Sequence, residues 1–156
     1  MSILSKIKRT IEFIPIIWKG YDFDYRSAVD LFEYQLSRTA NFLESDKAYS
    51  VESKQNAKRL KMILRLLDKV YNEDYVFEYT DQLTQEYGTM QMEWDPNDDK
   101  TYTLKGFKWS KAVDDAHNES INKVYKILLE KGMRKQERAH QLLWKLIEHN
   151  IRKFWD

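Results

Sequence analysis

Hydrophobic residues recur every three or four positions over most of the chain, which is the periodicity of amphipathic helices. In the first helix, residues 2–18, the pattern places Ile3, Ile7, Ile11 and Ile14 on one face, and Pro15 is expected to bend or end it. Asp24 and Ser50 are predicted to begin the next two helices. Further helices are predicted at residues 73–88 and 110–131, and from residue 133 to the C-terminus.

The last two predicted helices are separated by a single glycine, Gly132. Glycine commonly ends a helix, so the pattern predicts an antiparallel helical hairpin that turns there. Ser110 is expected to open the first of these helices, with Val113 and Val124 facing inward. Leu142 is expected on the inner face of the second.

Between residues 89 and 109 the period changes from that of a helix to that of a strand. Met90, Met92 and Trp94 alternate with polar residues, as do Tyr102 and Leu104 beyond a polar turn. This alternation predicts either a small β-hairpin or an irregular loop. The fold class is therefore an all-α bundle of about five helices with a hairpin or loop insertion at 89–109, in a single helical domain spanning residues 1–156.

The composition favours an ordered helical domain. Of the 156 residues 42% are hydrophobic and 33% charged, with 4 Gly and 2 Pro. The absence of cysteine excludes disulfides and thiolate metal sites. The longest apolar run, residues 13–18, is too short to span a bilayer. We therefore expect a cytoplasmic protein with no membrane partner and no cofactor.

The formal net charge of +1 hides a strong segregation of charge along the chain. Residues 73–99 contain nine carboxylates and no Lys or Arg, whereas residues 50–72 are basic. Five cations of this basic helix fall on one face, opposite the apolar stripe, and we call them the basic ridge. The basic ridge consists of Lys54, Lys58, Lys61, Arg65 and Lys69. Such a ridge is typical of a solvated helix face, and it also fits the phosphates of a nucleic acid.

Two carboxylate-x-x-His pairs, at residues 114–117 and 137–140, resemble ligand turns of di-iron bundles. In the predicted hairpin His117 and His140 lie about 10 Å apart along the axis, too far for one cluster, so no metal site is predicted. The acidic turn with Asp95, Asn97 and Asp99 lacks the glycine and glutamate of a calcium loop. We therefore interpret His117 and His140 as core histidines. We interpret the acidic residues as a solvent-exposed turn.

Arg134 and His140 form an Arg-x5-His pair, which resembles the Arg-x4-6-His signature of the HEPN ribonucleases. A histidine can shuttle a proton and an arginine can steady a phosphate during RNA cleavage. In a helix this rich in arginine the same pattern also arises by accident. Ribonuclease activity is therefore an alternative function.

The two ends of the chain carry aromatic motifs. Residues 14–18 read IPIIW, residues 22–25 read DFDY, and residues 154–156 read FWD. These motifs resemble those of a family of small helical proteins common in bacteriophage genomes. The resemblance implies an accessory role in a host cell and no particular reaction.

If the two ends meet in space, their aromatic and acidic side chains form one ligand or partner patch. We call this set the terminal patch, and it consists of Trp18, Asp22, Tyr25, Trp144, Trp155 and Asp156. The function expected from the sequence is a non-enzymatic phage accessory protein that binds a host protein or a small anionic ligand, in an anti-defence or host-takeover role. Nucleic acid is the alternative class of partner, and a homo-oligomer stays open.

Overall fold

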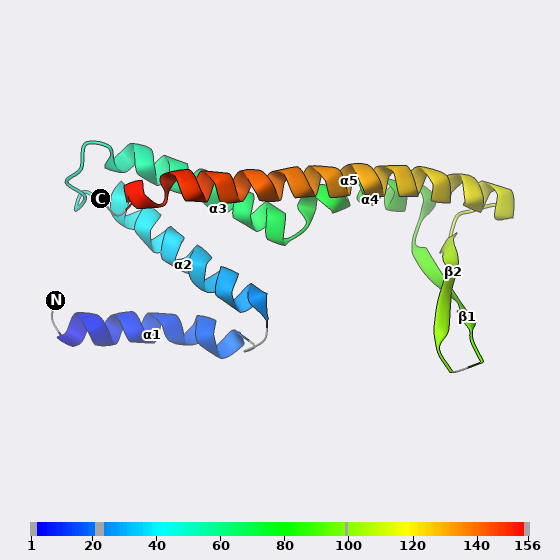
Figure 1. Cartoon of the computed structure of the whole chain (residues 1–156), viewed down its shortest axis with the longest axis horizontal. Helices are drawn as coiled ribbons and strands as arrows, with labels where there is room; N and C mark the ends of the chain where they lie inside the picture. Colours follow the sequence, from blue (N-terminus) through cyan, green and yellow to red (C-terminus); the bar gives the residue numbers. More distant parts are fainter. Residues whose placement is uncertain (1–2, 21–23, 99, 155–156) are drawn as a thin grey trace. The chain divides into compact units, whose positions relative to one another are not determined.

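The computed structural model describes residues 3–20, 24–98 and 100–154 (Figure 1). The expected fold is confirmed, because helices dominate and a small antiparallel sheet occupies the predicted insertion. The elements are α1 (Ile3–Lys19), α2 (Tyr25–Glu44), α3 (Ser53–Tyr71), α4 (Asp74–Tyr87), β1 (Met90–Pro96), β2 (Tyr102–Trp109), α5 (Asp115–Asn150) and a short 3-10 helix (Arg152–Phe154).

The chain divides into two compact units, one of residues 1–67 with 145–156 and the other of residues 68–144. The long helices α3 and α5 contribute residues to both units. The expectation of a single domain is not tested by this division and stays a prediction. None of the helices in the described ranges is both long and apolar enough to cross a membrane.

In the first unit, α1 packs on α2 through a small aromatic contact. The rings of Phe13 and Tyr34 meet edge to face with centroids 5.0 Å apart. Arg38 of α2 forms an ion pair of 2.6 Å with Glu12 and lies 5.7 Å from both ring centroids. Pro15 does not end α1, which continues to Lys19.

The core of the first unit comes from α2, α3 and the end of α5. Along α3 the buried positions recur every three or four residues, as the sequence pattern predicted. Asn56, also buried on α3, donates through Nδ2 to the carbonyl of Lys153 at 3.2 Å and so ties α3 to the chain after α5. The buried apolar residues of this unit are Leu36, Ala40, Ala57, Leu60, Ile63, Leu67, Ile147 and Phe154.

In the second unit, the hairpin of β1 and β2 is anchored to α5 through Trp109. This side chain is 2% exposed and packs with Leu83 of α4 and Ile121 of α5. The strands pair from Met90 opposite Trp109 to Pro96 opposite Tyr102, with a bulge at Lys105. Figure 1 shows the turn of the hairpin projecting away from α5.

Two asparagines of α5, four residues apart, hold β2 by its backbone and by Trp109. Asn118 accepts from the Trp109 backbone N–H at 2.9 Å and donates to the Phe107 carbonyl at 2.9 Å. Asn122 accepts from the Trp109 indole N–H at 2.9 Å and donates to the same carbonyl at 2.8 Å. Spacing of four residues puts both amides on one helix face, so the edge of the hairpin is fixed against α5.

The predicted helical hairpin at Gly132 is wrong. Residues 115–150 form one continuous helix of 36 residues. Its start is at Asp115 and not Ser110, whose hydroxyl instead accepts from the Thr89 N–H at 3.0 Å. The expected inner faces are also wrong in part, since Val113, Val124 and Leu142 are exposed.

Gly132 serves close packing between helices and not a turn. A Cβ atom at this position would lie 3.0 Å from the Val76 Cα and 3.2 Å from the Tyr75 carbonyl oxygen, both at the start of α4. Only glycine lets the backbone of α4 approach α5 this closely. A single sequence does not distinguish a glycine that lets two helices cross closely from a glycine that ends a helix.

We predict that Gly132→Ala destabilises the protein, although the same change in a helix interior normally stabilises by about 0.5–1 kcal/mol. Overpacking against backbone costs about 1–3 kcal/mol and exceeds that gain. The expected result is a fall in Tm of roughly 2–4 °C per kcal/mol lost, measured by calorimetry. Gly106→Ala is the matched control, because its Cβ would meet nothing within 4 Å. An equal or higher Tm for Gly132→Ala would contradict this account.

We also predict that Asn122→Ala costs about 1–3 kcal/mol of unfolding free energy, because the buried indole N–H of Trp109 loses its acceptor. Urea unfolding measures this cost. In a Trp109→Phe background, which has no indole N–H, the cost of Asn122→Ala should shrink. Gln141→Ala removes only an exposed hydrogen bond to Glu137 and serves as the control. Equal costs in both backgrounds would show that the indole bond contributes nothing.

Candidate functional site

A groove in the second unit gathers positively charged side chains of α5 beside a tyrosine of α4. Its volume is about 660 Å³, within the range of small-molecule sites. Four of its lining residues are cations and one is an acid. We call it the cationic groove, and it is lined by Tyr79, Ile127, Glu130, Lys131, Arg134, Lys135 and Arg138.

The four cations reach one groove because of their spacing on one helix. Lys131, Arg134, Lys135 and Arg138 are separated by three or four residues, which places their side chains on the same face of α5. Tyr75 and Tyr79, four residues apart on α4, present their rings to this face. The crossing at Gly132 brings the two rows together, since it lies beside both Lys131 and Tyr75.

Lysine side chains lie over the tyrosine rings. The Lys131 Nζ is 4.8 Å from the Tyr79 centroid. The Lys135 Nζ is 5.1 Å from the Tyr75 centroid and 5.5 Å from the Tyr79 centroid. Cation–π attraction of this kind holds the ammonium groups close to the rings without neutralising them.

Two carboxylates neutralise part of the positive charge of this surface. Lys135 forms a 2.6 Å ion pair with Glu78, and Arg134 lies 3.6 Å from Glu130 on the same helix. The hydrogen bond from Lys135 lowers the pKa of the Glu78 carboxyl, and the same bond raises the pKa of Lys135. Lys131 and Arg138 have no ion-pair partner among the described residues, so the groove keeps an excess of positive charge.

The spacing of the four cations that line the cationic groove could be seen in the sequence. The predicted turn at Gly132 assigned them to two different helices, so the groove was not predicted. The spacing of residues 131, 134, 135 and 138 is that of one helix face. A turn at Gly132 separates Lys131 from the other three cations and turns them toward different neighbours. The tyrosines of α4 carry no signal of their own, because their pairing with α5 is a matter of tertiary structure.

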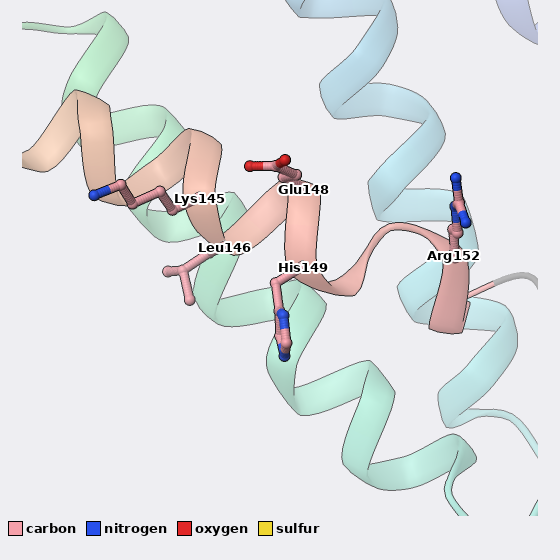
Figure 2. A pocket seen from close by; sticks show the side chains of 5 residues that line it. All are labelled: Lys145, Leu146, Glu148, His149 and Arg152. Atoms are coloured by element: carbon pink, nitrogen blue, oxygen red, sulfur yellow. The ribbon is translucent and has the colours of Figure 1, made fainter.

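A second hollow, near the end of α5 in the first unit, is lined by charged side chains that do not converge. Its lining residues are Lys145, Leu146, Glu148, His149 and Arg152. Figure 2 shows the Glu148 carboxylate and the His149 ring pointing in different directions. This hollow therefore offers no arranged pair of groups for acid–base chemistry.

Arg134 and His140, the predicted ribonuclease pair, have separate surroundings. The His140 Nε2 accepts from the Trp144 indole N–H at 3.0 Å, and both rings are on the protein surface. His140 is six positions after Arg134 on the helix, which corresponds to about 9 Å of rise and 120° of rotation. The structure does not bring the two side chains together within one chain, and the pair stays a prediction.

The first of the two carboxylate-x-x-His pairs, Asp114 and His117, has a structural role at the start of α5. Asp114 accepts from the His117 backbone N–H at 2.7 Å, and the His117 Nδ1 accepts from the Val113 N–H at 3.2 Å. This reciprocal arrangement caps the start of α5. His117 and His140 lie 23 residues apart on one helix, about 35 Å, so the separation of about 10 Å expected from a hairpin was wrong.

No group of three or more His, Asp or Glu side chains in the described ranges is arranged to hold a metal ion. Within the acidic turn, the Asn97 side chain bonds the hydroxyls of Thr101 and Thr103 at 2.9 Å each. Asn97 therefore shapes the turn of the hairpin. Asp99 lies outside the described residues.

Most side chains of the basic ridge are exposed, but its central cation, Lys61, is half-buried and forms an ion pair. Lys61 donates to both carboxylate oxygens of Glu44, at 2.6 and 2.7 Å. Lys54, Lys58 and Arg65 are exposed in the first unit. Lys69, in the second unit, lies 5.7 Å from the Tyr75 ring centroid.

The terminal patch is only partly described. Asp22, Trp155 and Asp156 lie outside the described residues. Trp18 and Tyr25 are exposed in the first unit, and Trp144 belongs to the second. The assembly of this patch stays a prediction.

Comparison with protein-family models, with curated proteins and with solved structures finds no significant match to this chain.

We predict that Lys135→Gln raises the pKa of Glu78 toward its ordinary value, because the hydrogen bond and the positive charge are both lost. NMR titration of the Glu78 side-chain carboxyl measures this shift. Since the pKa of Glu78 is lowered in the folded state, its pairing stabilises the protein above the unfolded-state pKa, and the stabilisation is lost as pH falls through the folded-state value. Lys126→Gln is the control, and an unchanged Glu78 titration in Lys135→Gln would contradict the pairing.

Proposed function

We propose that this protein is a non-enzymatic binding protein whose cationic groove takes a small anionic ligand. The observation that supports the proposal is the row of four cations on one face of α5, held beside Tyr75 and Tyr79 by the crossing at Gly132. A ligand with several negative charges compensates the excess positive charge of Lys131 and Arg138. Phosphate-bearing ligands fit this requirement best, because guanidinium groups bind phosphate oxygens in pairs.

The proposed accessory role in a bacteriophage, acting on host defence or metabolism, rests on the resemblance of the terminal motifs. A host protein is the alternative partner under the same proposal. Nucleic-acid binding through the basic ridge and RNA cleavage by Arg134 and His140 are the competing hypotheses. The cationic groove favours the small anion, because four cations line one hollow, whereas the central cation of the basic ridge, Lys61, is already paired with Glu44.

The proposal predicts binding of ATP and of inorganic pyrophosphate, measured by isothermal titration calorimetry, and no binding of adenosine. Arg138→Gln should weaken binding about tenfold, the loss expected for one charge-assisted hydrogen bond. Affinity should also fall as salt rises.

Lys126→Gln is the matched control for this experiment. It removes the same charge from the same helix, about 120° around the axis from Arg138. Equal affinity of the Arg138→Gln and unsubstituted proteins, or binding of neither anion, would exclude the cationic groove as the site.

A further inference from the structure

The apolar face of α1 is almost entirely exposed. The sequence predicted Ile3, Ile7, Ile11 and Ile14 on one face of this helix, but α2 contacts α1 on another side, through Glu12 and Phe13. The exposed fractions of the apolar face range from 49% at Ile14 to 87% at Trp18. We call it the α1 face, and it consists of Ile3, Leu4, Ile7, Ile11, Ile14, Ile17 and Trp18.

The α1 face is an apolar stripe in which Thr10 is a polar residue. At 100° per residue its seven side chains fall within an arc of about 140°. No charged side chain interrupts this arc. An exposed stripe of this length is costly in water and indicates a binding surface.

Cations flank the stripe on both sides. Lys8 and Lys19 follow one edge of the arc, and Lys6 with Arg9 follows the other. All four are exposed. Along the second edge a shallow hollow of about 440 Å³ is lined by Lys6, Arg9, Thr10, Phe13, Ile14 and Ile17. Apolar side chains and cations therefore meet along the same edge.

The described part of α1 carries one acid, Glu12, which is paired with Arg38 at 2.6 Å. The other charged side chains of the described part of α1 are therefore all positive. A second copy of the chain docked on this face would bring lysines beside lysines, with no acid of α1 to compensate them. The charge complement of the α1 face is an anionic surface.

We propose that α1 is an interfacial helix that lies on an anionic phospholipid bilayer. The isoleucines and Leu4 enter the boundary between headgroups and acyl chains, where helices of this pattern insert about 5–10 Å. Lys6, Lys8 and Lys19 extend their stems along the apolar surface and place their ammonium groups among the lipid phosphates. Trp18 lies at the depth that indole rings favour. The expectation of no membrane partner rested on the length needed to span a bilayer, and a helix that lies on the surface does not need that length.

Co-sedimentation of the full chain with vesicles tests this proposal. We expect binding to vesicles of equal parts phosphatidylcholine and phosphatidylglycerol, weaker binding to pure phosphatidylcholine, and a decrease as salt rises. Ile11→Glu puts a carboxylate in the middle of the α1 face and should reduce binding more than about tenfold. Lys8→Gln should weaken binding to the anionic vesicles alone.

Val51→Glu is the matched control, because Val51 is a fully exposed apolar residue outside α1. It should bind like the unsubstituted protein, and circular dichroism checks that all variants fold. Failure of the unsubstituted protein to bind anionic vesicles overturns the proposal. A dimer that Ile11→Glu dissociates, without vesicle binding, overturns it in favour of a second copy on the α1 face. Loss of anion binding to the cationic groove, which lies on α4 and α5, leaves this result unaffected.

Discussion

The close crossing of α4 over α5 at Gly132 is the constraint on which the second unit and its candidate site depend. A side chain at this position would meet backbone atoms of Tyr75 and Val76, so the two helices approach only because glycine has none. That approach places the tyrosines of α4 against the cations of α5. It also leaves α5 uninterrupted, so that Lys131 and Lys135 share one face. The cationic groove is thus a consequence of packing at one small residue.

The hairpin is attached to the same long helix by polar contacts. A two-stranded ribbon is marginally stable alone. Here its edge is held by Asn118 and Asn122, and Trp109 fills the space between α4 and α5. Its outer half remains uncovered, with Met92, Trp94 and Tyr102 exposed. The described aromatic side chains of the hairpin therefore divide into a buried anchor, Trp109, a half-buried Phe107 and the exposed Trp94 and Tyr102.

The two proposed surfaces differ in physical character. The cationic groove concentrates charge around a hollow, and its aromatic rings are covered by the lysines that lie over them. The α1 face is apolar and has charge only along its edges. The first suits a compact anion, whose binding is electrostatic, and the second suits an extended interface, where burial of apolar surface supplies most of the free energy.

The sequence by itself determined the helical class, the place of the insertion at residues 89–109 and the apolar stripe of α3, because these follow from the spacing of apolar residues along one element. Whether the insertion is a hairpin or a loop was decided by the tertiary structure. The sequence also determined the α1 face as a stripe, although not its exposure. Only the tertiary structure decided whether Gly132 ends a helix or allows a crossing, since both uses need the same missing side chain. The cationic groove depended on that decision. Periodicity defines which residues share a face, and it carries no information on which element, if any, packs against that face.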